Sequence, residues 1–252
     1  MKGVPLILIA GWGHTGQAML RLQEALAGYP AQVTSTGELW QTHSSGALPR
    51  SPHSLSGYAA GLHKLLADFG GSAVVIGWSM GGIVALETAR EYPGLLQRLV
   101  IISGTARFCT GNDEFPGVSV SVLRAMALGL RRTPDNVLAA YYAKVHAPQG
   151  VPMAEVAPRA QDIALLDRSE LLQGLDYLQR IDVRNGLDKP TVPTLVVHGR
   201  EDHIVPWQAG KWLSRALAVS HWRCYENYGH ALPIQAPLLL AADIRAFLGD
   251  AA

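Results

Sequence analysis

The amino-acid sequence predicts an α/β protein with a mostly parallel, doubly wound sheet and a helical insertion. Apolar runs typical of buried strands alternate with helix-like segments in the first and last parts of the chain. The stretch between them lacks strand patterns, and one strand runs straight into a Gly-x-Ser-x-Gly turn. We therefore expect residues 1–104 and 193–252 to form one core and residues 105–192 to form a helical cap or lid.

The first part of the chain begins with its clearest strand. Val4–Ala10 is continuously apolar and ends at Gly11, which is typical of a strand buried on both faces of a parallel sheet. The patterns that follow predict a helix over Gln17–Ala27, a weak strand and a loop over residues 31–54, a helix over Leu55–Phe69, a strand over Ser72–Ile76, a helix over Gly82–Tyr92 and a strand over Leu99–Ile102.

The alternation stops near Thr105 and resumes at Pro193. Between them, helical spacing covers Val118–Leu130, Pro134–Val145 and Asp162–Leu178, with Gly and Pro at the joints. The last part predicts a strand over Thr194–His198, a helix over Gln208–Ala218, a short strand over His221–Tyr225 and a helix over Pro233–Leu248.

Composition narrows the classes of function. The chain has 252 residues, a net charge of +1 and 16% charged residues, so no basic field indicates nucleic acid or an anionic membrane as a partner. No apolar stretch approaches the ~20 residues of a membrane span, and the apolar start is too short for a signal peptide. Cys109 and Cys224 lie far apart without metal-ligand spacing, as expected of buried thiols in a reducing compartment. We expect a cytoplasmic monomer.

The turn after the third predicted strand carries the candidate nucleophile. Val74-Val75-Ile76 leads into Gly77-Trp78-Ser79-Met80-Gly81, and a helix-like segment follows. This strand–turn–helix context is that of a nucleophile elbow with Ser79 at its tip. Gly77 and Gly81 would allow the close backbone approach that such a turn requires. The alternative is an ordinary tight turn with an inert serine.

A serine nucleophile needs a base and an acid that orients the base, and on this kind of sheet they follow in the order serine, acid, histidine. Asp202 lies in the loop after the strand Thr194–His198, where active sites of open α/β sheets form. The neighbouring Glu201 could replace it, and a turn or helix-cap role for Asp202 is the structural alternative.

The chain has nine histidines, of which His230 is the candidate base. It follows the last strand in the Gly-containing loop Asn227–Ala231, which can carry an imidazole over the sheet edge. Chain order or position speaks against the other eight, which are His14, His43, His53, His63, His146, His198, His203 and His221.

Acyl transfer also requires hydrogen-bond donors for the developing oxyanion. The backbone N–H of Met80 is one candidate, and the N–H of Trp12 in the loop Gly11–His14 is the other. The Trp12 indole could wall an acyl pocket or simply pack in the core, and His14 could line its mouth or face solvent. Neither a phosphate-binding glycine loop nor a metal cluster competes with this site, so we expect neither a cofactor nor a metal.

Five motifs recur together in one known superfamily. They are Gly11-Trp12-Gly13, Gly77-Trp78-Ser79-Met80-Gly81-Gly82, Asp113-Glu114-Phe115-Pro116-Gly117, Gly199-Arg200-Glu201-Asp202 and Gly229-His230. With them the chain resembles the α/β-hydrolases and, within these, the pimeloyl-acyl-carrier-protein methyl ester carboxylesterases of biotin synthesis. The tryptophans of the glycine motifs and the Asp-Glu-Phe-Pro-Gly segment carry the narrower resemblance. Two departures are Ala10, where the family has His, and a leading hairpin that is reduced or missing.

The resemblance implies hydrolysis of the methyl ester of a pimeloyl chain on acyl carrier protein, and of short-chain esters. It implies that a cap aromatic lines the acyl channel, which makes Tyr141 or Tyr142 substrate-binding candidates, with helix-face packing as the alternative. Cap arginines contact the acidic carrier in the resembling enzymes, and Arg131, Arg132 and Arg159 are the candidates here. Six basic residues face four acidic ones across residues 118–168, which a solvated surface would also explain.

The sequence thus predicts a serine carboxylesterase that works through a Ser-His-Asp triad and an acyl-enzyme. Another triad reaction on the same fold, such as carbon–carbon bond hydrolysis, lactone opening or perhydrolysis, is an alternative. A ligand-sensing protein with an intact triad and slow turnover is a second one.

Overall fold

The computed structural model describes residues 3–42, 55–111, 113–151, 164–188 and 192–249. Within them six strands form one sheet in the order β2-β1-β3-β4-β5-β6, and every neighbouring pair is parallel. The strands are β1 (Leu6–Ile9), β2 (Ala31–Thr34), β3 (Ala73–Trp78), β4 (Leu96–Ile102), β5 (Thr194–Gly199) and β6 (Ser220–Tyr225). The predicted fold class is confirmed.

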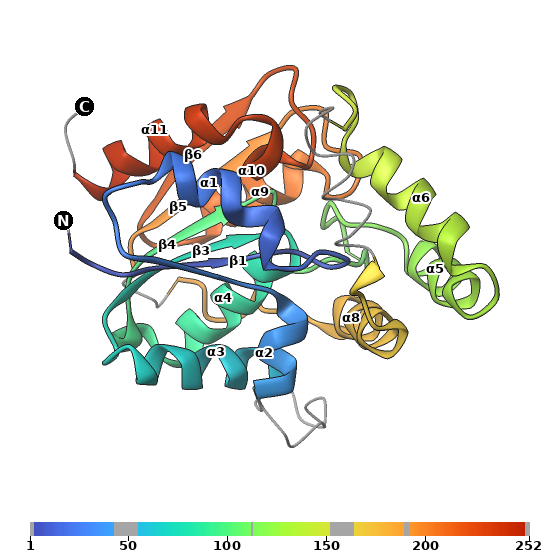
Figure 1. The fold of residues 1–252 in the computed structure, drawn as a ribbon, viewed down its shortest axis with the longest axis horizontal. Helices are drawn as coiled ribbons and strands as arrows, with labels where there is room; N and C mark the ends of the chain where they lie inside the picture. Colours follow the sequence, from blue (N-terminus) through green and yellow to red (C-terminus); the bar gives the residue numbers. More distant parts are fainter. Residues whose placement is uncertain (1–2, 43–54, 112, 152–163, 189–191, 250–252) are drawn as a thin grey trace.

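Helices cover the sheet and one of its ends (Figure 1). They are η1 (Gly16–Met19), α1 (Leu20–Ala25), α2 (Thr36–Thr42), α3 (Gly57–Asp68), α4 (Met80–Glu91), η2 (Pro93–Leu95), α5 (Val120–Arg132), α6 (Pro134–Val145), α8 (Arg168–Arg180), α9 (Trp207–Ala216), α10 (Leu232–Gln235) and α11 (Pro237–Leu248). In Figure 1, α2, α3 and α4 lie on one face, α1, α10 and α11 on the other, and α5, α6 and α8 beyond the end where β1 leads into its loop.

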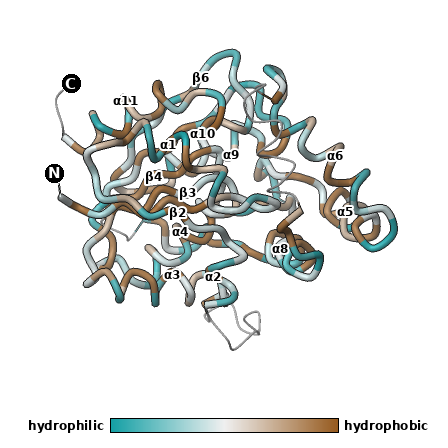
Figure 2. The backbone as a smooth tube through the Cα atoms, viewed as in Figure 1, coloured by the Kyte–Doolittle hydropathy of each residue, from teal (hydrophilic) through white to brown (hydrophobic). Residues whose placement is uncertain are grey.

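The core lies along the central strands. Every residue of β1, β3 and β5 is buried. Figure 2 shows hydrophobic colours in the middle of the sheet, around the label β3. Strands buried on both faces read as continuous apolar runs, which is why the sequence predicts them well. The edge strands β2 and β6 are only partly buried, and their patterns are correspondingly weaker.

The loop predicted after the second strand is wrong in part, because residues 36–42 form helix α2. A capping box starts this helix: the N–H of Ser35 donates to Glu38 Oε2 at 2.8 Å, and the N–H of Glu38 donates to Ser35 Oγ at 3.1 Å. The spacing Ser-x-x-Glu was the signal for it. Residues 43–54 of the same prediction lie outside the described residues.

The segment between β4 and β5 contains the helices α5, α6 and α8. It also forms two isolated β-bridges, Arg107 with Asp182 and Cys109 with Val118, which the sequence did not indicate. Helix α8 starts at Arg168, where Asp167 caps it by accepting the Ser169 N–H at 2.6 Å. Its predicted start at Asp162 lies outside the described residues.

A buried carboxyl group ties α8 to the sheet core. Glu87 of α4 accepts the N–H and O–H of Ser56 at 2.8 and 2.7 Å and the hydroxyl of Tyr177, on α8, at 2.9 Å. Burial raises the pKa of Glu87, and these three hydrogen bonds oppose the shift. A fully bonded polar group in this position joins α8 to α4, the helix that follows Ser79.

Two expectations from composition can be compared with the described residues. Both cysteines are free; Cys109 is buried as expected, whereas Cys224 is only half-buried. None of the helices that the structure describes has the length and apolarity needed to cross a membrane.

Candidate active site

Ser79 lies in a strained turn at the carboxyl end of β3. Its backbone angles are φ 56° and ψ −120°, a region that non-glycine residues rarely adopt. The Ser79 N–H donates to the Ile102 carbonyl at 2.8 Å, and the Ser79 carbonyl accepts the N–H of Gly82 at 2.9 Å. Strand β4 and the first turn of α4 therefore hold the serine in this conformation at the end of the sheet.

The glycines on both sides of Ser79 permit the turn, as the sequence indicated. A Cβ on Gly77 would lie 2.5 Å from the Gly81 carbonyl oxygen. A Cβ on Gly81 would lie 2.6 Å from the Ile9 oxygen and 2.9 Å from that of Ala10. Helix α4 thus approaches the backbone of β1 too closely for a side chain.

We expect Gly81→Ala to destabilise the protein, because the new methyl group must push α4 away from β1. Overpacking of this kind costs about 1–3 kcal/mol. The measurement is the urea concentration at half-unfolding. Gly94→Ala is the matched control, since nothing lies within 4 Å of its Cβ position. Equal midpoints for the two variants would contradict the close approach.

Asp202 and His230 meet beside this turn. His230 Nδ1 lies 2.7 Å from Asp202 Oδ2, and the other carboxylate oxygen, Oδ1, accepts the N–H groups of Ile204 and Val205 at 2.8 Å each. Both side chains are fully buried. An acceptor facing Nδ1 places the proton on that nitrogen and leaves Nε2 as the basic one.

The environment keeps Asp202 ionised. Burial alone would raise the pKa of its carboxyl group, but the charge of His230 and the hydrogen bonds from His198 and His230 hold that pKa well below its usual range. The carboxylate therefore carries its negative charge throughout the neutral pH range.

His198, which chain position speaks against as the base, lies next to the candidate acid Asp202. Its Nε2 lies 3.1 Å from Asp202 Oδ2 and 3.0 Å from the Val205 carbonyl, and its ring is fully buried at the end of β5. Both partners are acceptors, so Nε2 must carry the proton. Its position four residues before Asp202 was the only signal, and a strand-end position does not tell which way a ring points.

The second ring nitrogen of His230, Nε2, is the candidate basic atom. His230 Nε2 is buried and finds no hydrogen-bond partner among the described residues, Ser79 Oγ included. Such bonds are often long without substrate and tighten when it binds. The Trp78 indole N–H donates to the His230 carbonyl at 2.9 Å, so the strand that carries Ser79 also holds the base loop.

Two backbone N–H groups near Ser79 are available as donors. Among the hydrogen bonds of the described residues, none is donated by the N–H of Trp12 or of Met80. Trp12 lines the same cavity as Ser79, and Met80 directly follows the serine at the start of α4. Unpaired N–H groups at a helix start can stabilise a negative charge.

A largely apolar cavity of about 480 Å³ opens at Ser79. Its walls come from the loops after β1, β4 and β5 and from helices α5, α6 and α8, with Trp12, Phe108, Leu123, Met126, Val137, Tyr141, Leu175 and Leu178 among them. Tyr141 therefore contacts this space. Tyr142 is absent from the cavity lining, and its hydroxyl binds the Gly13 carbonyl instead.

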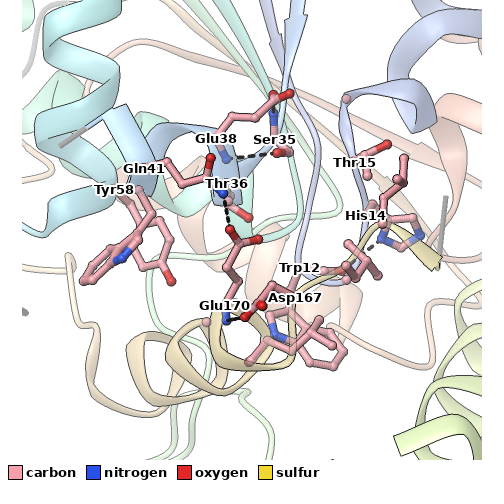
Figure 3. A pocket seen from close by; sticks show the side chains of 18 of the residues that line it. Trp12, His14, Thr15, Ser35, Thr36, Glu38, Gln41, Tyr58, Asp167 and Glu170 are labelled. Carbon is pink, nitrogen blue, oxygen red and sulfur yellow. Dashed lines mark hydrogen bonds between the residues drawn. The ribbon is translucent and has the colours of Figure 1, made fainter. Parts of the chain in front are cut away.

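A second, more polar cavity of about 360 Å³ shares Trp12 with the first one (Figure 3). His14 lines this second cavity rather than the one at Ser79, and is buried, with Nδ1 2.9 Å from the Trp12 carbonyl. Figure 3 shows Glu170 opposite the α2 side, where Gln41 donates to its carboxylate. The Trp12 indole thus stands between an apolar and a polar space.

The candidate carrier-binding arginines lie on the surface or outside the described residues. Arg131 and Arg132 are exposed at the end of α5, and Arg159 lies outside the described residues. Within the described residues, no group of three or more His, Cys, Asp or Glu side chains could hold a metal ion.

Comparisons with known proteins agree with the fold. The model of the alpha/beta hydrolase family matches residues 6–243. A pimeloyl-[acyl-carrier protein] methyl ester esterase of Vibrio atlanticus is 28% identical over 254 residues, which cover 96% of this chain and 91% of that protein. A bromoperoxidase structure from Bacillus anthracis has a TM-score of 0.85 at 21% identity, and an esterase structure from Exiguobacterium antarcticum has 0.85 at 18%. Each structural match covers 98% of this chain and 92% of the other, and at such identities it shows the fold alone.

Proposed function

The chain belongs to the alpha/beta hydrolase family and is a carboxylic ester hydrolase, and from this premise we propose that Ser79, His230 and Asp202 are its catalytic triad. The observation that carries the proposal is the 2.7 Å contact between His230 Nδ1 and Asp202 Oδ2 beside the strained Ser79 turn. The open cavity at Ser79 supplies space for an acyl group.

In the first step, Ser79 Oγ attacks the ester carbonyl while His230 Nε2 takes the hydroxyl proton. Asp202 holds the imidazole in the tautomer that can accept this proton and stabilises the imidazolium. The N–H groups of Trp12 and Met80 bind the oxyanion of the tetrahedral intermediate. His230 then returns the proton to the alcohol as the ester C–O bond breaks, which leaves an acyl group on Ser79.

In the second step, His230 takes a proton from water, and the hydroxide attacks the acyl carbonyl. Collapse of this intermediate releases the carboxylic acid and returns the proton to Ser79. The fully bonded Asp202 carboxylate supports this cycle, because two backbone N–H groups fix its direction while His230 changes charge.

We propose the methyl ester of pimeloyl-acyl-carrier protein as the substrate and the cytoplasm as the location. The name of the Vibrio atlanticus relative supports this choice, as does the apolar cavity lined by α5, α6 and α8. We propose that residues 105–192, to which these helices belong, act as the cap. The test compares kcat/KM for dimethyl esters of shorter and longer diacids with that for dimethyl pimelate, followed by complementation of a biotin-requiring strain. A maximum at another chain length and failed complementation would reject the substrate and leave the esterase intact.

We further propose that the acidic carrier docks at the exposed end of α5. Arg131 and Arg132 are solvent-exposed there and form no ion pair within the described part of the chain. Unpaired surface charges steer an oppositely charged partner and lose that effect as salt screens them.

Charge reversal tests this docking site. We expect Arg131→Glu with Arg132→Glu to lower kcat/KM for the carrier-bound ester by about tenfold or more at low salt. Hydrolysis of p-nitrophenyl butyrate should not change, since neither residue lines the cavity. Arg215→Glu on α9 together with Lys64→Glu on α3 is the control for net charge, since it reverses two exposed charges elsewhere on the surface. Unchanged cleavage of the carrier-bound ester by the double variant would rule out the site.

A further inference from the structure

The loop after β1 is held by two tyrosine hydroxyl groups from the cap segment. Tyr141 of α6 donates to the carbonyl oxygen of Trp12 at 2.9 Å, and Tyr142 donates to the carbonyl oxygen of Gly13. Both tyrosines are buried. Two neighbouring residues of one helix thus bind two consecutive carbonyl groups of the loop that carries a proposed oxyanion donor.

Helix α8 holds the side chain of the same loop. The Trp12 indole N–H donates to the Leu171 carbonyl at 2.8 Å, and the indole lies so close to Gly174 that a Cβ there would be 2.4 Å from Trp12 Cδ1. The ring of Tyr141 meets the indole edge-on, with centroids 4.7 Å apart and planes at 86°. Backbone and side chain of Trp12 are therefore both held from residues 105–192.

The loop needs outside contacts because its own backbone is permissive. Gly11 and Gly13 flank Trp12, and Gly13 has a φ of 71°. An oxyanion donor is effective only within about 2.7–3.1 Å of the developing charge. Tyr141 and Tyr142 bind the peptide groups on the two sides of Gly13, which is where the loop would otherwise turn most freely.

We propose that Tyr141 and Tyr142 are positioning residues that set the oxyanion loop from the cap. The proposal rests on the proposed serine-esterase function and differs from the expectation that these tyrosines only line the acyl channel. A channel wall acts on the bound acyl group and so on KM. A residue that places the Trp12 N–H acts on the transition state and so on kcat.

The test removes each hydroxyl and keeps each ring, in Tyr141→Phe, Tyr142→Phe and the double variant. We expect kcat for p-nitrophenyl butyrate to fall by about 3- to 30-fold for each single change, with KM within about twofold. A trifluoromethyl ketone adds to the serine as an oxyanion, so its inhibition constant should rise by the same factor as kcat falls. The inhibition constant of butyrate, which forms no oxyanion, should stay constant.

Tyr225→Phe is the matched control, because its hydroxyl binds Asp243 at 2.7 Å, away from the loop. Near-ultraviolet circular dichroism of every variant reports folding. A rise in KM and in the butyrate constant with unchanged kcat, or unchanged affinity for the ketone, would overturn the positioning role. Failure of a fluorophosphonate to label Ser79 in the unmodified protein would instead overturn the esterase mechanism, so the two failures are distinguishable.

Discussion

Replacing Ser79 with Ala should lower kcat for p-nitrophenyl butyrate by about 10⁴- to 10⁶-fold, because the members of a triad act as a unit. The variant should fold normally, since the hydroxyl forms no hydrogen bond within the described residues and the backbone bonds to Ile102 and Gly82 remain. The measurement combines initial rates with mass spectrometry after fluorophosphonate treatment. The unmodified protein should gain one adduct on Ser79, and the variant none.

Ser103→Ala is the matched control for this deletion. Ser103 follows the neighbouring strand β4, is fully buried and also has a positive φ, of 48°. Its hydroxyl finds no hydrogen-bond partner within the described residues, and it does not line the cavity at Ser79. Activity should therefore persist in this control. Near-normal esterase activity in Ser79→Ala itself would reject Ser79 as the nucleophile.

Replacing Asp202 with Asn should lower kcat by about 10³- to 10⁴-fold. Each carboxylate oxygen of Asp202 accepts two N–H groups, so an amide must point its NH₂ at donors whichever way it turns. With NH₂ toward His230, the imidazole must present a lone pair at Nδ1, and Nε2 then carries the proton. A base in that tautomer cannot accept the serine proton.

The same variant has a pH-dependent effect on stability. Because the folded-state pKa of Asp202 is lowered, its ionised form stabilises the fold above the unfolded carboxyl pKa, and this contribution is lost as the pH falls toward the folded value. The urea midpoints of the two proteins should differ most near neutral pH. The difference should shrink progressively as the pH falls below about 4, the unfolded carboxyl pKa. Asp68→Asn on the exposed end of α3 is the control. A difference in midpoint that is the same at every pH would contradict the lowered pKa.

The parts of the fold that the sequence predicted best are those in which one physical pattern dominates. Strands β3 and β5 are buried on both faces, so their apolar runs needed no other signal. Helix α2 was missed because its main mark is a two-residue capping box inside a polar stretch. Its burial comes from packing on α3, which no local pattern shows.

In the candidate site, too, the sequence predicted some features and not others. The order of Ser79, Asp202 and His230 and their positions after strands followed from topology alone. The directions of side chains did not follow from it. The contact of His198 with Asp202 and the reach of the Tyr142 hydroxyl to Gly13 depend on how elements distant in sequence pack together.

The attachment of the loop to α6 and α8 limits how freely the segment 105–192 can be exchanged. A chimera with the segment of a relative would receive a new acyl cavity, but a segment that does not place two hydroxyls and a carbonyl where Tyr141, Tyr142 and Leu171 have them would lose the contacts that hold Trp12. Such a chimera would combine the new acyl specificity with a displaced loop after β1. The unit to graft is therefore the segment together with its matching loop after β1, and chimeras that keep these contacts should be the ones that retain turnover.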